Sequence, residues 1–150
     1  MSKEMVLNGQ SFSVVTVTDD EGKLQKFQTK ELFKINKDQL MSEMLSFSED
    51  FGWWTRLEAE LWHQKRTMKS TMERVEADVA IFIRKGGIPD LKITAESVNS
   101  AIACDPRFLE SVSNYNEVCR LSDIVSGVVS TLRTKQDMIK LYTQTNSRQL

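Results

Sequence analysis

Cations gather at two points in the stretch WHQKRTMKSTMERVEADVAIFIRKGG, residues 62–87. The first group comprises Lys65, Arg66, Lys69 and Arg74, and Glu73 is the only acid among them. The second group, at the end of the stretch, comprises Arg84 and Lys85. Lysine and arginine neutralise phosphates, so these six residues are candidate contacts for a nucleic-acid backbone. Trp62, beside the first group, is a candidate for base stacking, although a tryptophan at helical spacing is more often a core residue.

A structural explanation competes for each of these cations. Basic residues near a helix C-terminus complement its dipole, and Arg74 can pair with Asp78 one turn later. For a single residue we favour that explanation. The set gains weight if several copies of the chain repeat it around an axis, because repetition would create a continuous phosphate track.

Residues for catalysis are missing from the sequence. It has no P-loop, no G-x-G-x-x-G and no G-x-S-x-G motif, and His63 is the lone histidine. The two cysteines, Cys104 and Cys119, are scattered, so the ligands of a metal site are also missing. We therefore expect a protein that is not an enzyme and that uses no metal and no cofactor.

Composition narrows the class of protein. The 150 residues have a net charge of −1, which excludes a wholly basic nucleic-acid coat and requires local clusters for anion binding. Two prolines and 27% charged residues are typical of long solvated helices in one ordinary domain. Neither a signal peptide nor an apolar run of membrane-spanning length is present, which predicts a soluble, cytoplasmic protein with no membrane partner.

The N-terminal segment differs from the rest of the chain. In residues 1–34, the run SFSVVTVTDDEGKLQKFQ predicts a small β-hairpin whose turn, DDEG, lets Gly22 take a positive φ. A lone hairpin is marginal in water. It must therefore pack on the helices, pair with another chain or stay mobile.

Helical patterns begin after this segment. Asn36 is predicted to cap a short amphipathic helix, with Gln39 returning the capping bond. Ser46 or Ser48 is then predicted to cap a long helix.

The long helix, Asp50 to Lys85, would span roughly 50 Å and end at the glycine pair 86–87 and Pro89. Heptad spacing gives it an apolar seam, and the two rows of that seam are Trp54, Leu61, Met68, Val75 and Phe82, with Glu58, Lys65, Met72 and Val79.

The second half repeats the pattern. Thr94 is predicted to cap a short helix, and Asp105 with Pro106 to start another long one. Its seam runs through Val118, Leu121, Val125, Val128, Leu132, Lys135, Ile139 and Tyr142. The expected fold is mainly α, a long helical hairpin with coiled-coil-like arms, in which residues 35–150 form one oligomerisation and DNA-binding domain.

Some apolar residues lie off these seams, namely Trp53, Trp62, Phe108, Leu109, Val129 and Met138. We expect a homo-oligomer, such as a closed ring, to cover them, the alternative being cover within one chain. Four further cations lie in the last eighteen residues of the sequence, namely Arg133, Lys135, Lys140 and Arg148. Because Lys135 stands on the seam, it either specifies register or reaches into a lumen.

Four stretches resemble the phage recombination-mediator family of the UvsY type, over about residues 35–145. INKDQLMSEMLSFSEDFGWWTRLEAEL looks like the family's entry segment through Ile35, Asn36, Leu40, Glu43 and Trp54. MERVEADVAIFIRK is similar to the middle of the family's long helix through Arg74, Val75, Glu76 and Ala77. KITAESVNSAIACDPRFLESV and SGVVSTLRTKQDMIKLY resemble the second half, the latter through Arg133, Lys135, Asp137 and Met138.

The resemblance implies a non-enzymatic accessory protein that assembles into a ring and binds single-stranded DNA without sequence preference. It also implies that the protein helps a recombinase load by displacing a single-strand-binding protein. The family's DNA contacts map onto Arg84 and Lys85, while residues 1–30 have no counterpart.

Two other hypotheses remain open. One is a helical protein–protein adaptor or assembly factor without a DNA role, favoured by the near-zero net charge and by a hairpin suited to strand addition. The other is a small inhibitor of a host enzyme, which the size alone supports.

Overall fold

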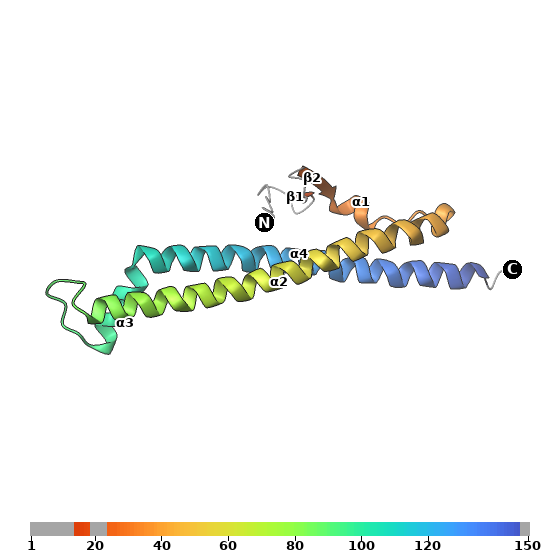
Figure 1. Cartoon of the computed structure of the whole chain (residues 1–150). Coiled ribbons are helices and arrows are strands. Elements are labelled where there is room, and N and C mark those ends of the chain that lie inside the picture. Colours follow the sequence, from red (N-terminus) through yellow and green to blue (C-terminus); the bar gives the residue numbers. More distant parts are fainter. Residues whose placement is uncertain (1–13, 19–23, 148–150) are drawn as a thin grey trace. The chain divides into compact units, whose positions relative to one another are not determined.

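The computed structural model describes residues 14–18 and 24–147 (Figure 1). They form two compact units: unit 1 takes its described residues from 1–58 and 124–150, and unit 2 spans Ala59–Asp123. The mainly helical class is confirmed, since the helices α1, α2, α3 and α4 account for most of the described chain. The domain boundary predicted between residues 34 and 35 falls inside unit 1 and stays a prediction.

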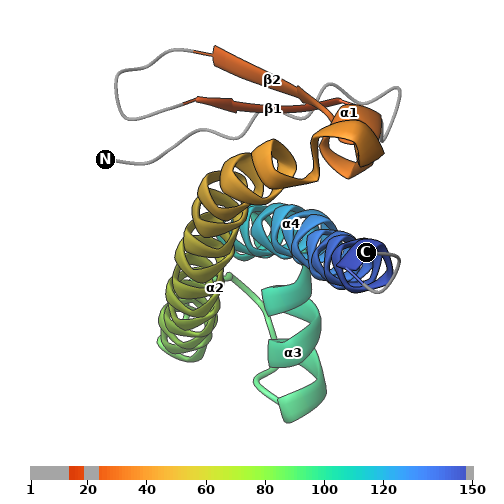
Figure 2. The same cartoon turned by 90° about the vertical axis from the view of Figure 1, so that its right-hand side faces the viewer.

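Unit 1 begins with two short strands. β1 (Val14–Thr18) and β2 (Leu24–Gln28) pair antiparallel, with Val14 opposite Gln28 and Thr18 opposite Leu24. The predicted turn around Gly22 lies outside the described residues, so the complete hairpin stays a prediction. Figure 2 shows α1 (Thr29–Phe33) following β2 directly.

A short 3-10 turn, η1 (Lys37–Gln39), leads into α2. The prediction that Asn36 caps this point is confirmed, because its side chain accepts a hydrogen bond from the backbone N–H of Asp38 at 3.1 Å. The predicted return bond from Gln39 is wrong. Glu43 Oε1 accepts the backbone N–H of Asn36 at 3.1 Å instead, since the first turn of α2 brings that carboxylate over the cap.

The long helix α2 (Leu40–Arg84) is continuous over 45 residues, so the predicted break at Ser46 or Ser48 is wrong. Ser46 Oγ donates to the Glu43 carbonyl at 3.3 Å, and Ser48 Oγ donates to the Met44 carbonyl at 3.2 Å. Each hydroxyl is therefore bonded to the preceding turn of its own helix and does not cap a new one.

The predicted stop of α2 is confirmed. Gly86 has a φ of 85°, and its N–H donates to the Ile83 carbonyl at 3.0 Å. The N–H of Gly87 donates to the Phe82 carbonyl, also at 3.0 Å. This pair of bonds is a Schellman motif, which satisfies the last carbonyls of the helix and needs a residue that tolerates positive φ.

Replacing Gly86 by alanine is expected to destabilise the protein by at least about 1 kcal/mol, because an L side chain is strained at this φ. Urea unfolding followed by circular dichroism measures the change. Lys85→Ala, at the adjacent exposed position, is the control and should leave the midpoint nearly unchanged. Equal midpoints for both variants would contradict the strained cap.

Both predicted helix starts in the second half are confirmed. Thr94 caps α3 (Ala95–Cys104) in a reciprocal capping box with Ser97. Asp105 Oδ1 accepts the backbone N–H of Arg107 at 2.9 Å, and α4 (Pro106–Ser147) begins at Pro106. The side-chain hydrogen bond from Arg107 lowers the pKa of Asp105, which keeps the capping carboxylate charged.

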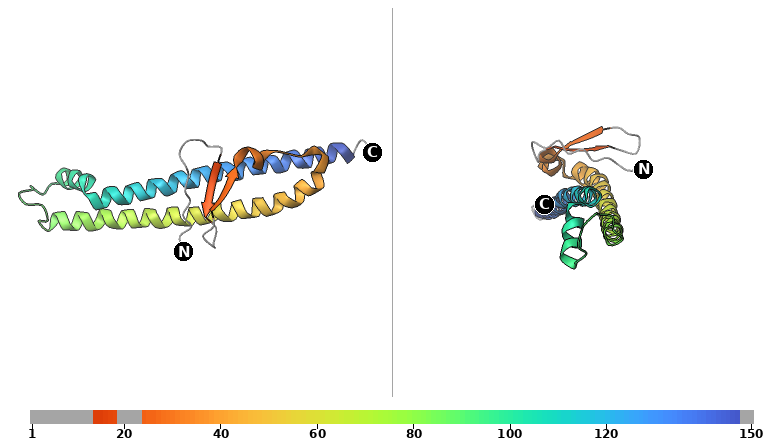
Figure 3. Two further views of the ribbon diagram at one scale, coloured as in Figure 1. Left: turned by 90° about the horizontal axis from the view of Figure 1, so that it is seen from above. Right: turned by 90° about the vertical axis from the view of Figure 1, so that its left-hand side faces the viewer.

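Within each unit, segments of α2 and α4 run side by side in opposite directions, as the colour order in Figure 3 shows. Every predicted seam position of α4 is buried or half-buried. On α2 the seam fails at its end, where Phe82 is 46% exposed and Ile83 is 1% exposed. Seven residues of a straight helix fall about 20° short of two full turns, so heptad positions rotate gradually away from the core. After the four heptads from Trp54 to Phe82, the position that points into the core is therefore one residue later, at Ile83.

Each unit has a core of its own. In unit 1 the buried residues are Phe47, Trp54 and Leu57 of α2 with Val125, Val128, Val129, Leu132 and Ile139 of α4. In unit 2, Val79 and Ile83 of α2 pack with Val98 and Ile102 of α3. Phe108 at the start of α4 joins this second cluster.

The residues predicted to need cover divide into two groups. Val129 is buried, Trp53 is half-buried against Trp54, and Phe108 packs on the unit 2 cluster, so the chain itself covers these three at least in part. Trp62, Leu109 and Met138 remain 57%, 51% and 40% exposed. Cover within one chain therefore explains part of the surplus and leaves an apolar remainder.

Candidate nucleic-acid interface

Five of the six predicted cations lie on the second half of α2, and Lys85 follows its last residue; all six belong to unit 2. Lys65 is half-buried, and the other five side chains are exposed. Within the part of the chain that the structure describes, none of the six has an ion-pair or hydrogen-bond partner. The predicted pair between Arg74 and Asp78 is not formed, so the six charges are available to an external anion.

The helix distributes these cations over two faces. At about 100° per residue, Arg66 and Arg84 point in the same direction, and Lys69 and Lys65 lie roughly 60° and 100° to one side of it, so these four share one broad face. Arg74 and Lys85 lie roughly 80–100° to the other side of Arg66, on a second face that is nearly opposite Lys65. The six residues therefore do not form one row within a single chain.

Acids interrupt the first face. Glu73 and Glu76 are exposed, and the helical spacing places them between Lys69 and Arg84. A strand that runs along α2 would meet repulsion there. The compact part of the first face is thus its start, and we call the residues Trp62, Lys65, Arg66 and Lys69 the basic patch.

Trp62 is 57% exposed, so its interpretation as a core residue is wrong. It stands three, four and seven residues before the three cations of the patch, which is the spacing of side-chain neighbours on a helix. An exposed indole can stack any base, and the cations beside it can hold the adjoining phosphates. The same spacing was visible in the sequence and is the signal by which Trp62 joins the candidate site.

The cations near the end of the sequence have other surroundings. Lys135 is largely buried in unit 1, where its Nζ lies 3.2 Å from Glu43 Oε2 and donates to the Leu32 carbonyl at 3.0 Å. Of its two predicted roles, this geometry supports register. Lys140 pairs with Asp137 at 3.9 Å, whereas Arg148 lies outside the described residues.

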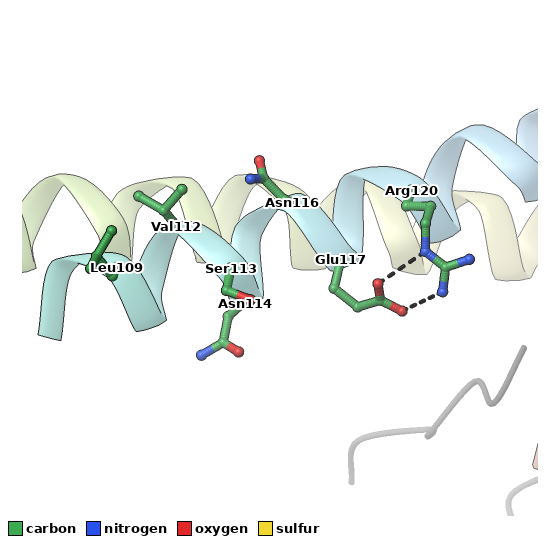
Figure 4. A pocket seen from close by; sticks show the side chains of 7 residues that line it. All are labelled: Leu109, Val112, Ser113, Asn114, Asn116, Glu117 and Arg120. Carbon is green, nitrogen blue, oxygen red and sulfur yellow. Dashed lines mark hydrogen bonds and ion pairs between the residues drawn. The ribbon is translucent and has the colours of Figure 1, made fainter. Parts of the chain in front are cut away.

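The first half of α4 carries a shallow depression, drawn in Figure 4. Its lining comes from one helix alone and includes Leu109, Ser113 and the Glu117–Arg120 ion pair. The hydrogen bonds from Arg120 lower the pKa of Glu117. Because a single helix face lines it, the depression is an open surface and does not enclose a ligand.

Among the described residues, no three His, Cys, Asp or Glu side chains are placed to hold a metal ion. None of the helices in this part of the chain combines the length and apolar character that crossing a bilayer requires.

The fold resembles that of a phage recombination mediator. The crystal structure of the bacteriophage T4 recombination mediator protein UvsY matches with a TM-score of 0.65 and 12% identity, over 81% of this chain and 93% of that one. No protein-family model and no curated protein matches the sequence. At this identity the likeness to UvsY concerns the fold.

Proposed function

We propose that this chain is a non-enzymatic recombination mediator of the UvsY type. It binds single-stranded DNA without sequence preference and promotes the loading of a recombinase, displacing a single-strand-binding protein. It acts in the cytoplasm of a bacterial host as a homo-oligomer. The fold likeness to a recombination mediator supports the proposal at the level of architecture.

One observation carries the DNA-binding part. Trp62 is 57% exposed among three cations that have no partner within the described residues. Phosphate contacts carry no sequence information, and every base offers a π-face. A patch of this composition therefore suits single strands of any sequence, since duplex bases are already stacked on one another.

Several copies of the basic patch, one from each protomer, would be needed to bind a strand continuously. One chain offers three clustered cations, and acids follow them on the same face. In a ring, each protomer adds its patch to those of its neighbours, so that a strand can pass from one patch to the next. The exposed apolar side chains that remain on the protomer support such self-association.

Single-strand binding can be tested with a labelled oligo-dT titrated at several salt concentrations. Arg66→Ala combined with Lys69→Ala should reduce the slope of log K against log salt by about 1.4, at about 0.7 for each lost phosphate contact. Arg84→Ala combined with Lys85→Ala should reduce it by about 0.7, because only Arg84 shares the face of the patch. Trp62→Ala should weaken binding by about 1–3 kcal/mol with little change of slope.

Arg56→Ala combined with Arg133→Ala is the matched control, since both arginines are exposed and belong to unit 1. It removes the same charge and should leave the slope close to that of the wild type. An equal loss in the control and the patch variant would mean that net charge alone drives binding. A wild-type protein indifferent to oligo-dT would favour the adaptor hypothesis.

A further inference from the structure

Two helical series of unit 1 contain no charged residue, and their members are exposed except Thr55, which is half-buried. On α4, the first series has members spaced alternately four and three residues apart along one side of the helix, namely Gly127, Thr131, Thr134, Met138, Leu141 and Thr145. On α2, the corresponding series is Met41, Leu45, Ser48, Gly52 and Thr55. We call these series the α4 face and the α2 face. Their spacing is that of a packing seam, so each is suited to receive another helix.

The α4 face contrasts with its neighbours on the same helix. The seam that begins at Val125 is occupied within the chain, where Val125, Leu132 and Ile139 are 0%, 1% and 3% exposed. The exposed positions on the other side of that seam are polar and include Arg133 and the ion pair of Asp137 with Lys140. The α4 face therefore differs from an ordinary solvated surface.

Large apolar side chains stand on both faces. Met41 and Leu45 are 73% and 70% exposed on the α2 face, and Met138 and Leu141 are 40% and 55% exposed on the α4 face. Such an accumulation on the uncharged sides of both helices is the signature of an interface.

The hydroxyl groups on these faces already have partners. On the α4 face, Thr131 donates to the Gly127 carbonyl at 2.9 Å, and Thr145 donates to the Leu141 carbonyl at 2.9 Å. On the α2 face, Thr55 donates to the Phe51 carbonyl at 2.8 Å. A hydroxyl bonded to the preceding turn can be buried without loss of a hydrogen bond. Both faces can therefore be dehydrated by a partner.

A glycine stands in the helical interior on each face. No atom lies within 4 Å of the position that a Cβ would occupy at Gly52 or at Gly127. Glycine weakens a helix, and nothing in the described chain requires it at these positions. Close approach of a backbone from outside the chain would explain both glycines.

We infer that the α4 face of one protomer packs against the α2 face of a second copy of this chain. A second copy is the occupant because one unit presents both faces, each uncharged and each with large apolar side chains and one glycine. The contact is heterologous, so it leaves one free face at each end and is satisfied fully when the assembly closes. The inference rests on the self-association in the proposed function and assigns its surfaces.

Light scattering over a range of protein concentrations tests the α4 face. Thr134→Lys should weaken association at least tenfold, whereas Ser113→Lys, which lies in the part of α4 that belongs to unit 2, should not. Both residues are exposed hydroxyl residues of α4, so the two variants form a matched pair. Gly127→Ala should raise the urea midpoint of the isolated protomer and yet weaken assembly, an opposition of sign that a purely intrachain role cannot produce.

Mixing two cysteine variants tests the pairing itself. In a background with Cys104→Ser and Cys119→Ser, protomers with Ser48→Cys and protomers with Thr134→Cys should form a disulfide only when mixed. Disulfides within either pure sample would overturn the heterologous arrangement.

The outcomes separate this inference from the proposed function. If the wild type assembles and Thr134→Lys behaves like Ser113→Lys, the assigned surface is wrong, while DNA binding and its salt slope stand. If the wild type stays monomeric at all concentrations, both the interface and the ring are overturned, and the oligo-dT titration still tests the patch by itself.

Discussion

Replacing Glu43 by alanine is expected to destabilise unit 1 by about 3 kcal/mol, because it leaves a largely buried ammonium group without its counter-ion. Lys135 Nζ lies 3.2 Å from Glu43 Oε2, and the two side chains are only 11% and 19% exposed. The carboxylate also accepts the backbone N–H of Asn36 at 3.1 Å. One substitution thus removes partners from two elements at once. Urea unfolding measures the loss.

A double-mutant cycle separates the pair from its surroundings. Lys135→Met alone should also destabilise the protein, since it leaves Glu43 uncompensated, but Glu43→Leu combined with Lys135→Met should recover most of the loss. Partial burial raises the pKa of the nearby Asp50, and the charge of Lys135 opposes that shift, so Asp50→Asn belongs in the background of a second cycle. Losses that simply add in the double variant would show that the two charges do not interact.

Replacing Trp54 by alanine is expected to destabilise the protein by about 3–5 kcal/mol, because it opens a large cavity in the core of unit 1. The side chain of Trp54 is 0% exposed. Its ring meets that of Trp53 edge to face, with centroids 5.0 Å apart and an interplanar angle of 89°. The loss therefore includes an aromatic contact as well as burial. Thermal and urea unfolding measure the change.

Trp62→Ala is the matched control for this variant. The residue type is the same and the helix is the same, but Trp62 is 57% exposed. It should lose less than about 1 kcal/mol of stability while weakening oligo-dT binding, whereas Trp54→Ala should do the reverse at temperatures where it remains folded. Equal destabilisation by both substitutions would show that Trp62 is also a packing residue.

The sequence was sufficient where local chemistry decides structure. Asn36, Thr94 and Asp105 cap where they were expected to, and Gly86 ends α2. Each of these features depends on a side chain and backbone groups within a few residues, which the sequence displays directly. The α4 seam was equally predictable, because its positions recur at regular intervals of three and four residues.

The sequence was insufficient where one local choice competed with another. Ser46 and Ser48 are good caps, yet both bond back into α2, since the helix gains more from continuing across apolar residues such as Phe47 and Trp54 than from ending. Phe82 and Ile83 compete in the same way for one buried position. The drift of a straight helix against the heptad decides that competition, and it accumulates over many turns.

The candidate site shows the same division. Its residue types, their clustering and the spacing of Trp62 from Lys65, Arg66 and Lys69 are properties of the sequence alone. Exposure of Trp62, the absence of partners for the six cations within the described chain, and their separation onto two faces are not. These depend on which side of α2 the core occupies, because burial of one stripe determines what the remaining stripes can present to a ligand.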